Sequence, residues 1–223
     1  MDVSEFLSPA RFIDSDSPAV VEFARDATAN TTSDIDRVLR LYRAVRDGIV
    51  YDPYVDMSDP ANYRASDVLK SRRTFCIGKA ALLAACVRAV GLPARVGYAD
   101  VRNHLTSRKL YERIKTDVFI WHSYSDLHLD GRWVKATPAF DLALCQRAGV
   151  KPLEFDGRSD SLFHPYDGEG RRHMEYLKDR GPFADVPFET IQADFQATYP
   201  ALMKAKGLAG DFHAEAVAEA TPS

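Results

Sequence analysis

The sequence lacks several features by which whole classes of protein are recognised. No apolar run approaches the roughly 18 residues that a membrane-spanning helix requires, and the N-terminus, MDVSEFLSPARFID, has neither a basic start nor an unbroken apolar segment. A secretory signal is therefore not expected. The three cysteines, Cys76, Cys86 and Cys145, are odd in number and widely spaced, which argues against a disulfide framework and against a CxxC metal site. These absences predict a soluble, cytoplasmic protein.

The chain also lacks an excess of either charge. Its 29 Lys and Arg residues stand against 32 Asp and Glu residues, for a net charge of -3, whereas a nucleic-acid-binding protein normally carries a strong basic excess. Hydrophobic residues make up 46% and charged residues 27% of the 223 residues, which is ordinary for a globular protein. We therefore expect one domain over residues 1–206, a C-terminal tail over 207–223 that can fray, and no nucleic-acid or membrane partner.

The first half of the chain has the periodicity of helices. Pro18 predicts the start of a short helix, and Asp34 is expected to cap a longer one whose apolar residues recur at three- and four-residue steps. The most apolar segment begins at Cys76 and stops at Gly91, with only two charged residues between them. A helix so nearly apolar on all sides is expected at the centre of the fold.

The second half changes to the pattern of strands. Asp130-Gly131 is the strongest short hairpin signal in the chain and lies between two β-prone segments, 118–129 and 132–140. We interpret the polar residues 102–115 as a surface excursion, and residues 150–187, rich in Gly, Pro and Asp, as a long ordered loop region. Helices followed by strands indicate an α+β fold.

The hairpin turn also predicts which residues share a face of the sheet. With two turn residues, Tyr124 lies opposite Thr137, and His122 points to the same, more polar face. Leu127 and its alternate neighbours then form the apolar face. We expect the polar face to be the one directed at Cys76.

Cys76 and His122 are the candidates for chemistry. The first turn of a helix offers free backbone N–H groups and the positive end of the helix dipole, which favour a thiolate. Lys79 lies on the same side of that helix and could assist. The alternative for Cys76 is a structural role, since cysteine is among the most buried residue types, and His122 by itself could equally be a surface histidine on a strand.

Two runs of sequence together resemble the core of the transglutaminase-like superfamily of papain-type cysteine enzymes. They are SRRTFCIGKAALLAACVRAVGLPAR and HSYSDLHLDGRWVKATPAF. In that family a cysteine begins a buried helix that leads into a Gly–Leu–Pro–Ala–Arg-like strand entry, and a histidine starts a strand of the form His-x-aromatic-x-acid. Here those residues are Cys76 and His122, and the resemblance covers roughly residues 34–141. It implies a papain/transglutaminase-like core, with a helical layer carrying Cys76 packed on an antiparallel sheet.

The sequence departs from the family at the third catalytic position. The family normally has an aspartate directly before a proline on the next strand, and here that position is Thr137. Asp141, four residues later, is the expected replacement, with Asn103 and Asp126 as alternatives. Asp126 is also expected to pair with Lys135 across the hairpin. A missing acid would equally fit a site that has lost catalysis.

The resemblance implies a cysteine-dependent hydrolase of peptide or isopeptide amide bonds that works through a thioester acyl-enzyme. Cys76 would be the nucleophile, His122 its base and Asp141 the residue that orients the imidazole. The backbone N–H of Cys76 would bind the oxyanion with an unidentified second donor. The substrate would be a peptide or protein, with no cofactor and no metal. The alternatives are a non-catalytic binding module and a cross-linking acyltransferase that uses a lysine amine; the absence of an EF-hand-like calcium loop favours hydrolysis.

Three weaker candidates remain in the sequence. His104 could serve as a rival base, although its polar surroundings favour a surface loop. The acidic segment LEFDGRSD, residues 153–160, suggests a cation site, but an Asp-Gly turn explains it equally well. His164 and His173 are too far apart for a recognisable metal spacing.

Overall fold

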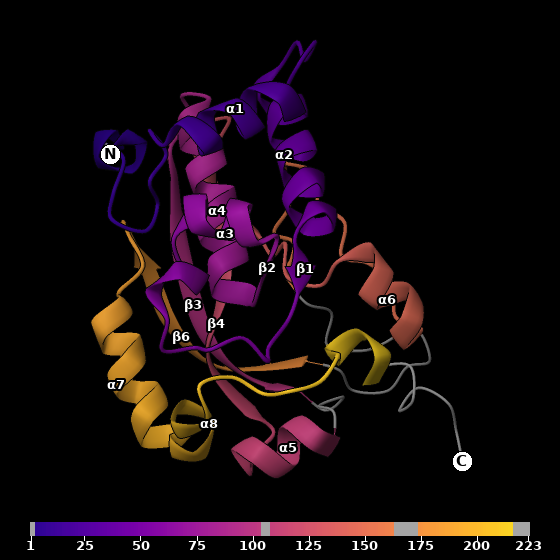
Figure 1. The fold of residues 1–223 in the computed structure, drawn as a ribbon. Helices are drawn as coiled ribbons and strands as arrows, with labels where there is room; N and C mark the ends of the chain where they lie inside the picture. Colours follow the sequence, from indigo (N-terminus) through magenta and orange to yellow (C-terminus); the bar gives the residue numbers. More distant parts are fainter. Residues whose placement is uncertain (1–2, 104–107, 163–173, 216–223) are drawn as a thin grey trace.

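The computed structural model describes residues 3–103, 108–162 and 174–215. Figure 1 shows a helical layer against an antiparallel sheet, as the sequence predicts. The first half of the chain supplies most of the helical layer: α1 (Pro18–Ala27), α2 (Asp34–Gly48), α3 (Ala65–Ser71) and α4 (Cys76–Ala89). The sheet strands are β3 (Ala94–Asn103), β4 (Val118–Leu129), β5 (Arg132–Ala136) and β6 (Met174–Phe183). They lie side by side in the order β5-β4-β3-β6.

Shorter elements connect and flank these layers. Two short parallel strands precede α4. Two helices between residues 188 and 205 lie at the lower left of Figure 1, beside the sheet. The remaining elements are η1 (Ser4–Leu7), β1 (Val50–Tyr51), η2 (Pro60–Asn62), β2 (Arg73–Thr74), α5 (Arg108–Ile114), α6 (Leu142–Ala148), α7 (Phe188–Thr198) and α8 (Pro200–Ala205). Among the residues that the structure describes, no helix is both long and apolar enough to cross a lipid bilayer.

The central helix predicted from the sequence is α4. Every residue from Cys76 to Arg88 is buried, and the helix packs on β3 and β4 on one side and on α1, α2 and α3 on the others. Gly78 allows this close packing, because a Cβ there would collide with the backbone oxygen of Asn62. Near the C-terminal end of the helix, the buried Arg88 guanidinium donates to backbone oxygens, including that of Ala94 (2.8 Å).

The predicted hairpin register is confirmed, but the ladder is shorter than expected. The pairs run from Leu129 opposite Arg132 to Ser125 opposite Ala136. There β5 ends, because the next residue whose N–H would face β4 is Pro138, which has none; the Thr137 N–H donates to the Ser161 oxygen on the other edge of β5 (3.1 Å). The expected pairing of Tyr124 with Thr137 therefore lies beyond the ladder.

The expectation about the faces of the hairpin is wrong. The Ser125 hydroxyl donates to the backbone oxygen of Ala80 in α4 (2.8 Å), so alternation directs Leu127 and Leu129 toward the helix and Tyr124 away from it. The physical reason is that a helix with an apolar surface on all sides gains most by burying the apolar face of the sheet.

Two segments predicted as irregular contain regular structure. Residues 150–187 include β6, which pairs antiparallel with β3 at the edge of the sheet, and residues 102–115 include α5. The strand is hard to recognise because its central residues, Tyr176 to Asp179, are all exposed at the sheet edge and show no alternation of apolar and polar types. The N-cap of α2 lies one residue before the predicted Asp34: the Ser33 side chain accepts the capping hydrogen bond.

Candidate active site

Cys76 is the first residue of α4, as the sequence predicts. The short parallel pair of β1 and β2 leads the chain into the helix, with Tyr51 opposite Thr74. The side chain of Cys76 is 8% exposed. The backbone N–H groups of Ser123, Ile77 and Cys76 itself lie where they favour the ionised sulfur and act to lower its pKa. The start of the helix therefore touches the middle of β4.

Burial dominates the acidity of this thiol. It raises the pKa of Cys76 to about 11, and the three backbone N–H donors lower it by less. At pH 7 the thiolate fraction is then about 1 in 10,000. The N–H groups at the helix start favour the thiolate, but burial outweighs them, so the thiol needs a base to lose its proton.

Lys79 does not assist the thiol as the sequence suggested. Its ammonium is fully buried and donates to the backbone oxygens of Arg46 (2.7 Å) and Ile49 (2.6 Å) at the end of α2. Burial lowers the pKa of Lys79 to about 7, while the nearby carboxylates of Asp141 and Asp47 act in the opposite direction. Lys79 thus joins α4 to α2.

His122 lies beside Cys76 because β5 ends early. The His128 N–H donates to the Pro93 oxygen on the β3 side (2.9 Å), so alternation directs the Ser123 N–H to the opposite edge of β4, the side of β5. The sulfur of Cys76 reaches this edge at the peptide between His122 and Ser123. His122 is 6% exposed and lines the same pocket as Cys76.

The residue before His122 has an unusual backbone. Trp121 has a φ of 60°, which is rare for a large side chain and implies local strain. The Asp100 carboxylate accepts the Trp121 N–H (3.1 Å) and binds Arg180 through both oxygens (2.5 and 3.0 Å). Arg180 also binds Asp194, which accepts the indole N–H of Trp121 (2.8 Å). Carboxylates therefore hold both the backbone N–H and the indole N–H of Trp121.

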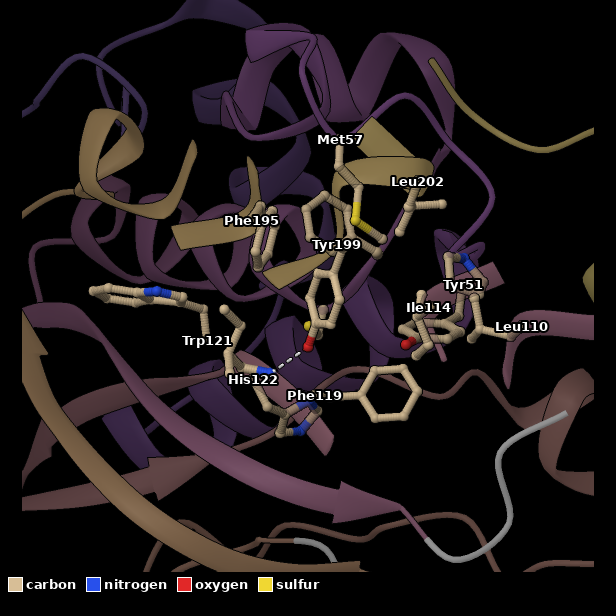
Figure 2. Close-up of a pocket in the computed structure, with 14 residues that line it drawn as sticks. Tyr51, Met57, Leu110, Ile114, Phe119, Trp121, His122, Phe195, Tyr199 and Leu202 are labelled. Carbon is tan, nitrogen blue, oxygen red and sulfur yellow. Dashed lines mark hydrogen bonds between the residues drawn. The ribbon is translucent and has the colours of Figure 1, made fainter. Parts of the chain in front are cut away.

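The pocket beside Cys76 is small and mainly apolar. It encloses a cavity of about 50 Å³ and draws its wall from α4, β4, α5, α7, α8 and the loop after β1. In Figure 2, Met57, Phe195 and Leu202 lie on one side of the Tyr199 ring, and Phe119 and His122 lie beyond its hydroxyl. The residues of the wall are Tyr51, Pro53, Met57, Phe75, Cys76, Leu110, Ile114, Phe119, Ile120, Trp121, His122, Phe195, Tyr199 and Leu202.

Tyr199 closes the pocket against β4. Its hydroxyl accepts from the Ile120 N–H (2.8 Å, the dashed line in Figure 2) and donates to the Val118 oxygen (2.7 Å). Burial raises the pKa of Tyr199, and the charges of Asp100 and of an ionised Cys76 act in the same direction. Tyr199 and Cys76 line the same pocket. The sequence showed the helical spacing of α7 but carried no signal that it covers the thiol.

Asp141 lies behind the wall of the pocket and does not line it. It caps α6: one carboxylate oxygen accepts from the Leu144 N–H (2.9 Å), and the other accepts from the Tyr51 N–H (3.0 Å). His213 Nε2 is 3.2 Å from the same second oxygen. Tyr51 is a wall residue, so Asp141 is separated from the cavity by the main chain of Tyr51.

Of the alternatives for the third position, Asp126 is used elsewhere. It lies opposite Lys135, as predicted, but its carboxylate binds the Arg95 guanidinium at 2.8 Å instead. Asn103 ends β3, four residues beyond Ala99, the cross-strand partner of His122. Neither residue belongs to the wall that Cys76 and His122 share.

Thr137 is the remaining alternative. It is 2% exposed, directly after the end of β5. Its backbone oxygen accepts from the Tyr42 hydroxyl (3.1 Å). Its own hydroxyl finds no hydrogen-bond partner among the residues that the structure describes.

The weaker candidates give no metal site within the described ranges, where no cluster of three His, Cys, Asp or Glu side chains occurs. In the acidic segment, Asp156 caps a turn by accepting from the N–H groups of Arg158 and Ser159, both at 2.7 Å. His104, His164 and His173 lie outside the described residues.

Comparisons with known proteins bear on the family and the fold of the chain. A model of the Transglutaminase-like superfamily matches residues 21–138, just over half of the chain. Among solved structures, the chain resembles a putative cysteine protease from Cytophaga hutchinsonii, with a TM-score of 0.51 and 19% identity over 83% of this chain and 48% of that one. It also matches a putative protease from Parabacteroides distasonis ATCC 8503, with a TM-score of 0.38 and 16% identity over 63% of this chain and 26% of that one. The chain thus spans about half the length of the first structure. No curated protein matches it.

Proposed function

The chain belongs to the transglutaminase-like superfamily, and on that premise we propose that it is a cysteine-dependent hydrolase of peptide or isopeptide amide bonds. The observation that carries the proposal is the meeting of Cys76 and His122 on one pocket wall, with the sulfur against the Ser123 N–H. A buried thiol at a helix start, next to a histidine, is the arrangement that acyl transfer requires.

The reaction begins from the neutral thiol. His122 takes the proton of Cys76 as the sulfur attacks the carbonyl carbon, and a C–S bond forms. The N–H groups of Cys76 and Ser123, both of which favour negative charge at the sulfur, donate to the oxyanion. His122 returns the proton to the leaving amine as the C–N bond breaks. Water, deprotonated by His122, then hydrolyses the thioester and regenerates the thiol.

Two residues are proposed for orienting the His122 imidazole. Asp141 is the short carboxylate that follows the position of the family's acid, and it supplies a negative charge behind the wall. Thr137 occupies the position itself and has a buried hydroxyl. A hydroxyl can orient an imidazole, but it stabilises the imidazolium less than a carboxylate does.

The test is acylation of the purified protein by p-nitrophenyl acetate. We expect a burst of p-nitrophenolate and a mass increase of one acetyl group on Cys76, which Cys76→Ala abolishes and His122→Asn slows at least 100-fold. Cys86→Ala, in the same helix, is the matched control and retains the burst. Addition of methylamine distinguishes the acceptors, because a hydrolase releases acetate and a cross-linking acyltransferase releases N-methylacetamide.

A non-catalytic binding module is the second candidate. The raised pKa of the Cys76 thiol and the threonine at the position of the family's acid both favour it. This candidate predicts that no ester acylates Cys76 at any pH up to 9, although the pocket is intact. The same burst experiment therefore separates the two functions.

A further inference from the structure

The chemical character of the pocket wall limits the groups that can lie next to the thiol. Among the described residues that line it, none carries a carboxylate, a guanidinium or an ammonium group. The Tyr199 hydroxyl faces the cavity but is already bonded to Ile120 and Val118. Apart from the His122 imidazole, which the reaction itself uses, a charged group placed in this pocket would lose its water without gaining a charged partner, which is unfavourable.

The size of the cavity sets a second limit. An apolar cavity of about 150 Å³ holds a benzene molecule, so the 50 Å³ beside Cys76 has room for a chain of about two to four carbon atoms. Met57 forms part of the wall and is only partly buried. A flexible thioether of this kind adapts to small differences in shape, but it does not create space for a long chain.

We propose that the part of the substrate that enters this pocket, directly beside the scissile carbonyl, is short and apolar, and that the pocket disfavours charged and long groups at that position. The inference rests on the proposed function and names its substrate class. In an ester test, the C–S bond forms as the C–O bond breaks, the proton passes from the thiol to His122, and the phenolate leaves.

Four p-nitrophenyl esters test the proposal: propionate, butyrate, octanoate and the monosuccinate. Butyrate and monosuccinate have acyl chains of four carbons and differ by a terminal carboxylate, which is ionised at pH 7.5. We expect butyrate to acylate Cys76 on the order of 100-fold faster than monosuccinate, because an unpaired carboxylate is buried only at a cost of several kcal/mol. Octanoate should react about tenfold more slowly than butyrate. Equal rates for butyrate and monosuccinate would overturn the proposal.

A variant of the wall gives the matching control. Met57→Lys places an ammonium at the partly exposed rim, where a lysine can extend its charge to water. It should raise the rate with monosuccinate at least tenfold relative to butyrate, whereas Met57→Leu should keep the preference of the natural protein. A Met57→Lys protein that is folded, by thermal unfolding, and keeps the original preference would contradict the assignment of this wall.

Protection of the thiol separates failure of the pocket from failure of the catalysis. The ketones butyrophenone and 4-oxo-4-phenylbutanoic acid have no leaving group and cannot acylate the thiol, but an occupant of the pocket slows its alkylation by iodoacetamide. We expect butyrophenone to slow alkylation of Cys76 at least threefold and 4-oxo-4-phenylbutanoic acid to have no effect. Protection of this kind without ester acylation would refute the hydrolase and support the apolar selectivity; no protection by either compound would refute the selectivity.

Discussion

At the scale of single residues, the Cys76 thiol is subject to two opposed effects. The helix start and three backbone N–H donors favour the thiolate, and burial favours the neutral thiol more strongly. Position in the sequence reveals the first effect, because a helix start can be recognised from its pattern. It does not reveal the second, because Tyr199 and Leu202, which help to bury the sulfur, arrive from more than 100 residues away.

The alkylation rate of Cys76 should therefore keep rising with pH. With a pKa of about 11, the rate with iodoacetamide should increase about tenfold per pH unit from 7 to 10, whereas an ordinary cysteine levels off near pH 9. Intact mass and peptide mapping measure it. Cys86, fully buried in the same helix, is the internal control and should react far more slowly. A plateau below pH 8 would mean that His122 holds Cys76 as a thiolate in the resting protein.

Asp141 and Thr137 can be separated by their effects on stability. Asp141→Ala removes the N-cap of α6 and leaves the buried Tyr51 N–H without its acceptor, so it should lower the free energy of unfolding by about 2 to 4 kcal/mol. Thr137→Val removes a hydroxyl that no described residue bonds and should change it by less than about 1 kcal/mol. Urea denaturation measures both changes.

The rate of ester acylation, measured below the unfolding transition of each variant, then assigns the orienting role. If Thr137 orients His122, Thr137→Val slows acylation about tenfold while stability is retained. If Asp141 does, Asp141→Ala slows it by a larger factor even where the protein is folded. Unchanged rates in both variants would remove the third member from the mechanism.

At the scale of elements, the strain of the site lies in a β-bulge before His122, where the pairing of β3 with β4 shifts between Ala99 and Val101. The left-handed backbone of Trp121 is held by Asp100, which is held in turn by Arg180. None of this was visible in the sequence, because the three residues lie on three different strands. The register of the β4–β5 hairpin was predictable from its turn, since Asp130-Gly131 fixes the pairing locally. The end of that ladder follows from Pro138, which lacks the N–H that the next pair with β4 would need.

Removal of Asp100 should release this bulge. Asp100→Ala leaves the Arg180 guanidinium, which is 15% exposed, without its main partner, and should lower the free energy of unfolding by about 3 kcal/mol. Amide hydrogen exchange at Trp121 should become faster, since its N–H loses its acceptor. Asp117→Ala is the control, because Asp117 pairs with Arg102 at the surface and such pairs contribute at most about 1 kcal/mol. Unchanged exchange at Trp121 in Asp100→Ala would contradict this account.

At the scale of the whole molecule, the sequence predicted the two layers and the place of the central helix, because both follow from hydrophobic periodicity. It did not reveal β6, whose exposed and charged residues resemble a loop. It also could not place the C-terminal helices over the pocket, because an amphipathic helix shows only that it has a partner and not which partner.

The stability of the protein should depend on pH through the buried Lys79. Its pKa is about 7 in the folded protein and 10.5 in the unfolded chain, so between these values the unfolded chain binds more protons. Stability is then fully present above pH 10.5 and is lost as the pH falls through 7. The free energy of unfolding should rise by up to about 1.4 kcal/mol per unit between pH 7 and 9.

Above pH 9 the buried thiols act in the opposite direction, because the raised pKa values of Cys76 and Cys145, both about 11, disfavour ionisation in the folded state. Urea denaturation should therefore be measured from pH 7 to 9, where the effect of Lys79 is not opposed by the thiols. Lys79→Met should flatten the slope in that window, and Lys178→Met, on the exposed edge strand, should leave it unchanged. A wild-type stability that is constant or falls from pH 7 to 9 would show that Lys79 stays charged in the folded protein.

The place of Tyr199 and Leu202 has a consequence for the order in which a ribosome makes this chain. The helix that begins with Cys76 and strands β3 and β4 are synthesised before α7 and α8. A domain generally folds as a unit, so the nascent chain holds its thiol without this cover until α7 and α8 have left the ribosome. The thiol is therefore more accessible to oxidants and electrophiles during synthesis than in the folded protein, where Tyr199 and Leu202 help to bury it.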